Sequence, residues 1–536
     1  MVDACQDGFV SDPWWREAVF YHIYPLSFVD TDGDGYGDIQ GVKDKLDYLV
    51  WLGIDAIWLS PVYESPMIDW GYDVTDHTGI DPLFGDLDEF DELLEAIHER
   101  GLKLLMDLII NHTSNKHPWF LESRSSRDNP KRDWYVWKPS KEPGEPPNNW
   151  VSVFSGPAWS WDEHTGQWYR HTYLPEQPDL NWRNPDVVEA MMGVMRFWLD
   201  RGVDGFRVDA AHQIMKDPQN RDNPPTPPGY VDPYKEMGEY GKWIHVFDRG
   251  QDDVHGIHRQ MRKLADEYER DILTIGEIHE FDPTHWIAYY GSDDELNMPF
   301  NYQLMVAEWT AAGVRKAVEA VEGVLPEWGW TNWTMGNHDE IRVASRLGDR
   351  GARQAAVLLA TLRGTPFLYY GDEIGMLNGP SHGHDPWGDN VAFLSRDGCR
   401  TPMQWHPGNG GVGFTSGEPW IPIGPDRDHR NVEIQKGDPL SFLAQYRSLL
   451  ALRRERRSLR LGDIRFVDTE EEEMLVFVRS SDGESTAVGV NFSNRPVQMR
   501  RSGDVVFALG DYESHPESIL LGPHSAVITD TSEGDE

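Results

Sequence analysis

Two charged side chains interrupt an apolar run near the middle of the sequence. Residues 203–210 read VDGFRVDA, and the apolar residues of this run predict a short buried strand. Arg207 and Asp209 stand two positions apart, so a strand places both on the same side. A buried guanidinium and a buried carboxylate need each other, because an unpaired buried charge is costly. Taken alone, the pair fits a structural ion pair as well as a catalytic site.

Acids and histidines follow three further apolar runs. They are Asp107 with Asn111 and His112, then Glu277, then Asn337 with His338 and Asp339. The carboxyl ends of parallel strands meet on one face of a barrel, and barrel enzymes place their catalytic groups there. We therefore expect these side chains to converge with Arg207 and Asp209 in one site.

Three carboxylates, those of Asp209, Glu277 and Asp339, each end a different predicted strand. Two carboxylates on either side of a bond between sugars are the usual machinery of glycoside hydrolysis. One attacks or stabilises the sugar, and the other, with a raised pKa, protonates the leaving oxygen. These residues alone predict a barrel hydrolase that acts on a neutral, polar substrate.

Eight apolar strands alternate with helical segments along the chain. We predict strands at 16–28, 55–61, 102–110, 203–209, 273–276, 296–300, 333–335 and 365–370. We predict helices at 43–52, 89–100, 187–201, 255–270, 354–363 and 442–457. This alternation predicts an α/β protein built on a (β/α)8 TIM barrel.

Two segments depart from that alternation. Residues 113–180 are rich in Trp, Pro, Gly and Asn and are too long for a connecting loop, so we expect an irregular subdomain inserted after strand three. Short alternating runs near the end predict a C-terminal antiparallel β-sandwich domain. The expected division is barrel 1–112, inserted subdomain 113–180, barrel 181–457 and all-β domain 458–536.

Composition limits the partners of the protein. The 536 residues carry a net charge of −41, which repels nucleic acid and anionic membranes and argues against phosphorylated substrates. The acidic, lysine-poor composition fits a salt-adapted protein as well as an ordinary acidic enzyme. No apolar run reaches the roughly 18 residues of a membrane span, and no secretory signal is visible. Two distant cysteines, Cys5 and Cys399, favour a reduced cytoplasmic protein over a disulfide. We expect a monomer or a homodimer.

An acidic loop follows the first predicted strand. Acids alternate with glycines in DTDGDGYGD at 30–38, which makes an oxygen-rich loop like the first half of an EF-hand. Carboxylates this close repel one another unless a cation lies among them. We predict a Ca²⁺ site, with Mg²⁺ as the alternative ion, and the other interpretation is a solvated acidic turn. The candidate ligands are Asp30, Asp32, Asp34, Tyr36 and Asp38.

The ordered motifs identify a resemblance. The chain resembles the α-amylase superfamily, family 13 of the glycoside hydrolases, in DLIINH at 107–112, GFRVDA at 205–210, IGEIHE at 275–280 and GNHDE at 336–340. QPDLN at 177–181 and RTPMQW at 400–405 resemble the α-glucosidase and oligo-1,6-glucosidase branch. The resemblance implies a TIM barrel that acts on a small oligosaccharide or glucoside, without an organic cofactor, and a structural Ca²⁺ in the acidic loop.

The resemblance also implies a role for each acid. Asp209 matches the nucleophile, which forms a β-glucosyl-enzyme, and Glu277 matches the general acid and base. Asp339 matches the third carboxylate, which holds sugar hydroxyls as positive charge develops on the sugar. Arg207 would keep Asp209 ionised and aimed. Asp107 resembles a structural aspartate, for which packing and loop support is the simpler interpretation.

Further residues match the pocket that holds the terminal glucose. His112 and His338 match histidines that hydrogen-bond the sugar, and Tyr72 matches its aromatic platform. The resemblance implies that a matched pair closes the pocket and that two aromatic residues line it. The pair is Asp69 with Arg400, and the aromatic residues are Phe154 and Tyr173, the latter where relatives often carry Phe.

Ala210, directly after the nucleophile, bears on linkage. In this branch a Val there accompanies α-1,6 linkages, and Ala accompanies α-1,4 linkages. The sequence therefore predicts a retaining exo-α-glucosidase on maltose-like substrates, with some transglucosylation. The alternatives are a transferase or isomerase of the same scaffold, such as a trehalose synthase or a sucrose-active enzyme, and an oligo-1,6-glucosidase. A non-catalytic relative is disfavoured, because all three acids are present.

Overall fold

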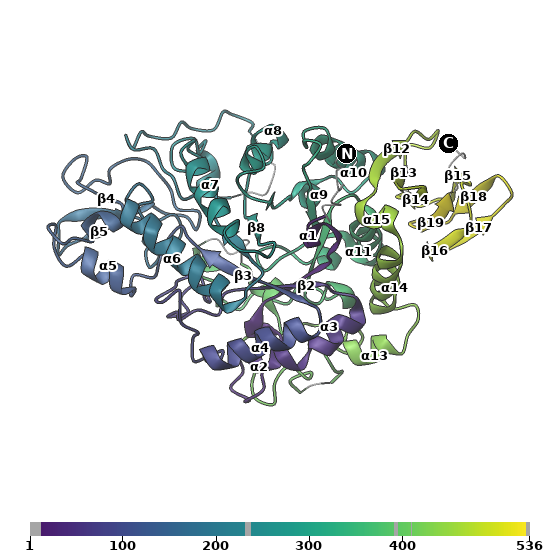
Figure 1. The fold of residues 1–536 in the computed structure, drawn as a ribbon, viewed down its shortest axis with the longest axis horizontal. Helices are drawn as coiled ribbons and strands as arrows, with labels where there is room; N and C mark the ends of the chain where they lie inside the picture. Colours follow the sequence, from purple (N-terminus) through teal and green to yellow (C-terminus); the bar gives the residue numbers. More distant parts are fainter. Residues whose placement is uncertain (1–11, 231–236, 391–394, 409, 532–536) are drawn as a thin grey trace, which may run out of the picture.

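An eight-stranded parallel sheet forms the centre of the molecule. The computed structural model describes residues 12–230, 237–390, 395–408 and 410–531. Its strands follow one another in the order β10-β11-β1-β2-β3-β7-β8-β9, which confirms the predicted barrel (Figure 1). The strands are β1 (Phe20–Ile23), β2 (Ala56–Leu59), β3 (Lys103–Ile109), β7 (Gly205–Asp209), β8 (Leu273–Gly276), β9 (Met298–Pro299), β10 (Asn332–Thr334) and β11 (Thr365–Tyr369).

The register of β3, β7 and β8 brings the predicted acids together. Asp107 on β3 is the partner of Arg207 on β7, and Ile109 is the partner of Asp209. Arg207 is also the register partner of Ile275 on β8, and Ile275 stands two residues before Glu277. Because parallel strands share one direction, the carboxyl ends of all three open on the same face.

The seam between β9 and β10 is bridged by a side chain. The Asn332 amide on β10 donates to the Pro299 carbonyl on β9 at 2.8 Å. Its oxygen accepts from the Asn301 backbone N–H at 3.1 Å. Pro299 has no N–H to offer a neighbouring strand, so a regular ladder is not available at this position. The fully buried Asn332 side chain replaces that ladder.

Helices cover the outside of the barrel (Figure 1). Helix α4 illustrates why they form: Asp86 and Glu89 make a reciprocal capping box at its start, and Phe90, Leu94 and Ile97 bury one face. The longer helices are α4 (Leu87–Glu99), α6 (Pro185–Arg201), α7 (Val254–Ala265), α10 (Ala311–Glu322), α11 (Val343–Thr361) and α14 (Phe442–Glu455). The shorter helices are α1 (Trp14–Glu17), α2 (Ile39–Asp44), α3 (Leu46–Leu52), α5 (Pro118–Ser123), α8 (Pro283–Trp286), α9 (Gln303–Val306), α12 (Pro386–Asn390), α13 (Val432–Lys436) and α15 (Arg457–Leu461).

The segment between β3 and α6 holds more order than the sequence predicts. It contains a three-stranded antiparallel sheet of β4 (Trp137–Lys138), β6 (Gln167–Arg170) and β5 (Trp159–Asp162). Its end returns to the barrel, where the Leu180 N–H donates to the Asn111 carbonyl at 3.0 Å. Buried Asp179 pairs there with Lys216 at 3.0 Å. The insertion is therefore tied to the strand end that carries His112.

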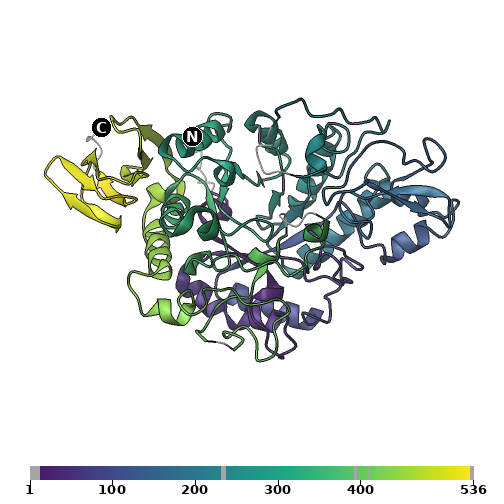
Figure 2. The ribbon, with the colours of Figure 1, turned by 180° about the vertical axis from the view of Figure 1, so that it is seen from behind.

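The C-terminal region forms two antiparallel sheets, as predicted. One has the order β12-β13-β14-β19-β16 and the other β15-β18-β17. Buried Arg479 joins them to the barrel, since it donates to the Thr361 carbonyl of α11 at 2.6 Å. This region and the insertion lie at opposite ends of the molecule (Figures 1 and 2). The strands are β12 (Asp463–Val467), β13 (Met474–Ser481), β14 (Glu484–Asn491), β15 (Val497–Arg500), β16 (Val505–Leu509), β17 (Tyr512–Ser514), β18 (Ser518–Leu521) and β19 (Ala526–Thr531).

Some expectations differ from the structure or stay predictions. The first strand is four residues long rather than spanning 16–28, because the chain turns into a short 3-10 helix at Pro25–Ser27. Cys399 is buried with a free thiol, and Cys5 lies outside the described residues. Within the described ranges, no helix has the length and apolarity needed to cross a membrane. The four domain boundaries, the oligomeric state and the cytoplasmic location remain predictions.

We predict that Asn332→Ala destabilises the barrel. The change leaves a buried N–H and a buried carbonyl without partners, so we expect a loss of about 2–4 kcal/mol in the free energy of unfolding. Urea denaturation followed by tryptophan fluorescence measures the change. Asn332→Asp puts a buried carboxylate against the Pro299 carbonyl and should destabilise the protein at least as much as Asn332→Ala. A loss below about 0.5 kcal/mol for Asn332→Ala would show that the seam does not depend on this side chain.

Candidate active site

One guanidinium holds three carboxylates at the carboxyl ends of β3, β7 and β8. Arg207 Nη1 lies 2.6 Å from Asp107 Oδ1 and 2.7 Å from Asp209 Oδ1, and Nη2 lies 3.0 Å from Glu277 Oε2. The Arg207 side chain is 1% exposed. A single buried cation therefore faces three acids, and it sets the position of the two predicted catalytic groups.

The charge imbalance in this cluster favours retention of a proton. Burial raises the pKa of Asp209 well above its ordinary value, and the charges of Glu277 and Asp107 add to burial, against the opposing effect of Arg207. Burial likewise raises the pKa of Asp107 to about 6. Arg207 aims Asp209 as expected, but it does not by itself hold this pKa down. Because the groups titrate together, the proton belongs to the cluster.

Asp339 lies in the opposite electrostatic environment. Its Oδ1 accepts from Arg400 at 3.0 Å and Arg396 at 3.3 Å, and its Oδ2 lies 3.3 Å from His338 Nε2. Burial opposes ionisation, but these cationic and polar neighbours outweigh it and bring the pKa of Asp339 well below its ordinary value. Asp339 is therefore held as an anion beside a cluster that keeps a proton.

The pair that closes the pocket is not the one inferred from sequence. Asp69 forms its ion pair with Arg396, at 2.7 Å, and not with Arg400. Arg396 also binds Asp385 at 2.6 Å and Asp339 at 3.3 Å. Arg400 instead donates from Nε to the His338 carbonyl, at 2.8 Å, and pairs with Asp339. Arg396 thus joins three acids from three loops, and Arg400 fixes the loop that carries Asp339.

Aromatic and histidine rings form the floor beside these acids. The rings of Tyr72 and His338 are nearly parallel, with centroids 5.2 Å apart. The Tyr72 hydroxyl donates to Asp107 at 3.0 Å, so Asp107 braces both the platform and Arg207. His112 Nε2 lies 3.1 Å from the Gln177 amide, which also donates to Asp69 at 3.0 Å. This chain of contacts holds His112 and Asp69 on one wall.

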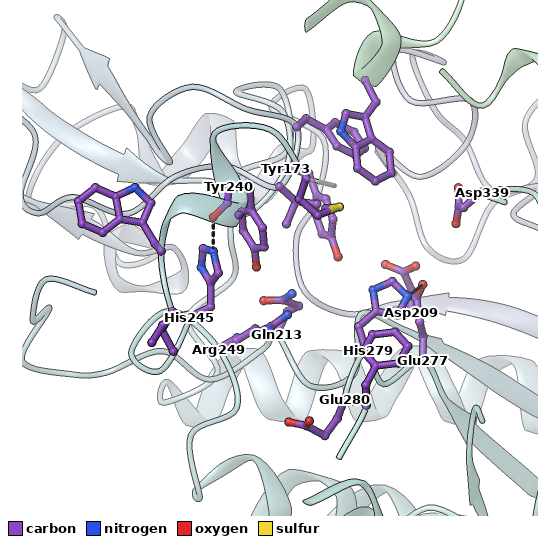
Figure 3. Close-up of a pocket in the computed structure, with 18 of the residues that line it drawn as sticks. Tyr173, Asp209, Gln213, Tyr240, His245, Arg249, Glu277, His279, Glu280 and Asp339 are labelled. Carbon is purple, nitrogen blue, oxygen red and sulfur yellow. Dashed lines mark hydrogen bonds and ion pairs between the residues drawn. The ribbon is translucent and has the colours of Figure 1, made fainter. Parts of the chain in front are cut away.

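A cavity of about 710 Å³ opens above the acids (Figure 3). Nine of the twelve predicted catalytic and binding residues line it, and three do not. Those that line it are Asp69, Tyr72, His112, Phe154, Tyr173, Asp209, Glu277, His338 and Asp339. The three outside the lining are Arg207, Ala210 and Arg400, which act through the groups that they hold.

Ala210 has a structural role that its sequence does not reveal. Its backbone N–H donates to Glu277 Oε2 at 2.9 Å. The residue has a φ of 44°, in the left-handed region, where a β-branched side chain is strained. The turn therefore aims the amide at Glu277, and a small residue fits this conformation best.

Several lining residues were not predicted. They are contributed mainly by the segment after β7 and by the loops after β8 and β11. They include Gln213, Met237, Tyr240, Trp243, His279, Trp387 and Arg396. Gln177 lies in a motif that the sequence analysis quoted without assigning it a role. For the other residues, which stand in irregular loops, no spacing distinguishes a lining side chain from a solvated one.

The acidic loop gathers three carboxylates rather than four. Oxygen atoms of Asp30, Asp32 and Asp38 lie within 4.8 Å of one another. Asp34 is outside this group, because its carboxylate accepts from the Tyr36 backbone N–H at 2.8 Å. Burial raises the pKa of Asp38, and the nearby charge of Asp30 adds to the rise. An all-oxygen, mutually repelling set fits a hard divalent cation such as Ca²⁺.

The geometry supports acid–base chemistry on a polar ligand that enters the cavity. A carboxylate cluster that holds a proton lies beside a carboxylate held as an anion, and an aromatic platform lies beneath both. Neutral, hydroxyl-rich molecules suit such a cavity. Their hydroxyl groups can both donate to the carboxylates of the lining and accept from its histidines and arginine.

Comparison with known proteins gives a consistent result. Residues 22–462 match the family described as alpha amylase, catalytic domain. The chain is 41% identical to a probable alpha-glucosidase of Rhizobium meliloti, over 90% of each chain. It is 39% identical to an oligo-1,6-glucosidase of Parageobacillus thermoglucosidasius, over 92% of this chain and 93% of that relative.

Two solved structures resemble the whole fold. The alpha-glucosyl transfer enzyme XgtA has a TM-score of 0.92 and 40% identity, covering 97% of this chain and 100% of XgtA. The trehalulose synthase MutB of Pseudomonas mesoacidophila MX-45 has a TM-score of 0.86 and 34% identity, covering 97% of this chain and 100% of MutB. The proteins that this chain resembles are thus named as glucosidases, as a glucosyl transfer enzyme and as a trehalulose synthase.

We predict that Asp107→Asn moves the acidic limb of the pH profile of kcat/KM to lower pH, because the charge of Asp107 helps to raise the pKa of Asp209, which attacks as an anion. The change keeps the shape of the side chain and removes a negative charge, so the remaining carboxyls release their proton more readily. Loss of one charge-assisted hydrogen bond to Arg207, worth about 1.5–3 kcal/mol, should also lower kcat about 10- to 100-fold.

Asp88→Asn, an exposed change in the first turn of α4, is the matched control for that variant. It removes the same charge at a position outside the cavity lining and should leave the acidic limb in place. An unchanged or upward-moving limb in Asp107→Asn would show that Asp107 does not help to hold the proton.

Proposed function

The chain belongs to the α-amylase family of glycoside hydrolases, and we propose that it is a retaining exo-acting α-glucosidase. It releases α-glucose from the non-reducing end of short α-1,4-glucosides such as maltose. The observation that carries the proposal is the pairing of Arg207 with both Asp209 and Glu277, beside a wall in which Arg396 joins Asp69 to Asp339.

Asp209 and Glu277 divide the chemistry. Asp209 attacks the anomeric carbon and forms a β-glucosyl-enzyme, while Glu277 protonates the leaving glycosidic oxygen. Glu277 then takes a proton from water as the water attacks the intermediate, which gives net retention.

Retention of the anomeric configuration is supported by the short contacts that Arg207 makes with both Asp209 and Glu277. Retaining enzymes hold their carboxyl groups about 5–5.5 Å apart, whereas inverting enzymes leave room for a water between them. Arg207 contacts one oxygen of Asp209 at 2.7 Å and one of Glu277 at 3.0 Å through its two terminal nitrogens. A shared planar guanidinium favours the shorter separation.

Exo action is supported by the closed wall around the platform. Asp69, Arg396 and Asp339 form a continuous set of ion pairs across loops that follow β2, β10 and β11. A sugar seated on Tyr72 meets this wall at its non-reducing end, so a second sugar cannot extend beyond it. Asp339, held as an anion, stabilises positive charge on the ring as the bond breaks.

The α-1,4 preference rests on Ala210. Its backbone N–H donates to Glu277 from a left-handed turn, and a β-branched residue there would strain the turn and shift the acid against the leaving sugar. This position acts through Glu277 and not through contact with the cavity. We therefore propose maltose rather than isomaltose as the better substrate.

Transfer to a second sugar is the alternative function, in the manner of a trehalose synthase or a sucrose-active isomerase. The likeness to XgtA and to a trehalulose synthase favours this alternative. The same β-glucosyl-enzyme serves both outcomes, because either water or a sugar hydroxyl can attack it. The acceptor end of the cavity decides between them.

We propose that Asp30, Asp32 and Asp38 hold a structural Ca²⁺. Asp30 accepts from the Gly33 and Gly35 amides, at 2.7 and 2.8 Å, and from Thr415 after β11. The cation would neutralise the loop and join it to that distant segment. It would supply no chemistry to the sugar.

Incubation with maltose, isomaltose, sucrose and trehalose, with products resolved by chromatography, tests the proposed function. We expect fast glucose release from maltose and slower release from isomaltose, with α-glucose as the first anomer seen by NMR. Asp209→Asn should lose at least about 10⁴-fold in kcat, which corresponds to roughly 5.5 kcal/mol of transition-state stabilisation. A main product of trehalose or of a rearranged disaccharide would favour the transferase, and β-glucose as first anomer would exclude retention.

Chelation tests the Ca²⁺ proposal separately. EDTA should lower the melting temperature, and Ca²⁺ at 100 times its Kd should restore about 2.7 kcal/mol of stability. Asp32→Ala, an exposed member of the cluster, should lose this response to Ca²⁺. Equal melting curves for the native protein with EDTA and with Ca²⁺ would indicate a solvated turn.

A further inference from the structure

A second cavity lies at the other end of the barrel from the catalytic acids. Its volume is about 210 Å³, and Val19, Asp55 and Lys103 line it at the amino ends of β1, β2 and β3. Residues of α1, α14 and α15 line the remainder. Because parallel strands share one direction, their amino ends open away from the face that carries the acids. We call this hollow the basal cavity.

Positive charge exceeds negative charge in the lining of the basal cavity. The chain as a whole has 49 basic and 90 acidic residues, so this local excess opposes the composition of the protein. A charge that is withdrawn from water needs a partner of opposite sign. The cations of the lining are Lys103, Arg453, Arg454 and Arg460, and its acids are Glu17 and Asp55.

The two acids of the lining are already matched with two of its cations. Asp55 pairs with Arg454 at 2.6 Å, and Glu17 pairs with Arg460 at 3.2 Å. Lys103 binds a carboxylate outside the lining, just before β7, at 2.8 Å. Three of the four cations therefore have a carboxylate partner, and one has none.

Arg453 is the cation without a carboxylate partner in the described chain. It is 1% exposed, and its terminal nitrogens donate to the carbonyls of Ala360, Leu459 and Gly364, at 3.3, 2.7 and 2.9 Å. Its Nε has no hydrogen-bond partner among the residues that the structure describes. Burial lowers the pKa of Arg453 to about 10, so its guanidinium stays charged at neutral pH. Carbonyl dipoles thus solvate this charge, but no anion neutralises it.

A second buried arginine adds to the excess beside the basal cavity. Arg479 on β13 and Arg453 on α14 donate to the same Leu459 carbonyl, at 3.0 and 2.7 Å. Burial lowers the pKa of Arg479 well below its ordinary value, and the charge of Arg453 adds to the decrease. Helix α14 lies between the barrel and the C-terminal sheets (Figure 1). Two like charges therefore meet where these parts of the molecule join.

We propose that the basal cavity binds a compact inorganic anion, such as chloride or phosphate, which neutralises Arg453 and stabilises the junction of the barrel with the C-terminal sheets. Lys103 and Arg460 have side chains that are 37% and 29% exposed, so they can contact the ion directly. A cavity of about 210 Å³ has room for such an ion and for water molecules that complete its shell. The inference is independent of the proposed function, because the cavity does not adjoin the acids.

A bound anion has an effect that differs from general screening by salt. Screening depends on ionic strength, whichever ions supply it. A specific site instead saturates with one anion while the ionic strength is constant. The net charge of −41 repels anions from the rest of the surface, so the basal cavity should account for most of the chloride that the protein binds.

A chloride titration followed by the line width of the chlorine NMR signal tests the inference. Gluconate, a bulkier organic anion, replaces chloride at the low concentrations and holds the ionic strength constant. We expect broadening by the full-length native protein that saturates with chloride. Added inorganic phosphate then identifies the type of ion: displacement of chloride assigns the site to an oxyanion, and persistence of the broadening assigns it to a halide.

Two lining variants and one control locate the site. Arg460→Gln and Lys103→Gln each remove one cation from a partly exposed position, and each should raise the Kd for chloride about tenfold. Arg315→Gln on α10 is the matched control, because its side chain is 33% exposed, pairs with Glu319 at 2.8 Å and lies outside the lining. It should leave the Kd unchanged. A circular dichroism spectrum like that of the native protein shows that each variant is folded.

A crystal soaked in bromide locates the ion through anomalous scattering. A peak in the basal cavity of the native protein that is lost in Arg460→Gln supports the inference. Absence of saturable broadening, or bromide peaks only outside the basal cavity, overturns it. An equal Kd in the native protein and both lining variants indicates an adventitious ion only, and this result also overturns the inference.

Discussion

The structure depends on the balance of one buried cation against three buried acids. Arg207 has no access to water and contacts Asp107, Asp209 and Glu277 at 2.6–3.0 Å. Such a cluster is stable only if strands β3, β7 and β8 keep their register, because a one-residue slip turns each side chain to the other face. The excess of acid over base raises the pKa of Asp209 and of Asp107, so the cluster retains a proton. The packing of the barrel and its chemistry therefore share one constraint.

A second network of ion pairs holds Asp339, which Arg207 does not contact. Arg396 and Arg400 bring Asp339 to the cavity as an anion, and Arg396 extends the wall to Asp69. The two networks differ in the sign of their excess charge, so carboxylates in one cavity have pKa values that are shifted in opposite directions. This separation of roles follows from the number of arginines beside each acid and not from the acids themselves.

The sequence predicted the barrel, the C-terminal sheets and nine of the residues that line the cavity. Strand periodicity and the order of the motifs carry this information, because both are local properties of the chain. The partner of Asp69 was predicted wrongly. Asp69 and Arg396 are 327 positions apart and lie in irregular loops, where no periodicity fixes the direction of a side chain. Ala210 was assigned a pocket role, whereas its amide bonds Glu277 at a left-handed turn.

The sequence by itself determined which residues could do the chemistry and on which strand ends they stand. A strand alternates sides with a period of two, and a barrel collects its carboxyl ends on one face, so Asp209, Glu277 and Asp339 had to converge. Only the tertiary structure decided which arginine meets which acid, which acids keep a proton, and what lies beyond them. Ion pairs and pKa values depend on distances and burial between loops that meet only in the folded chain.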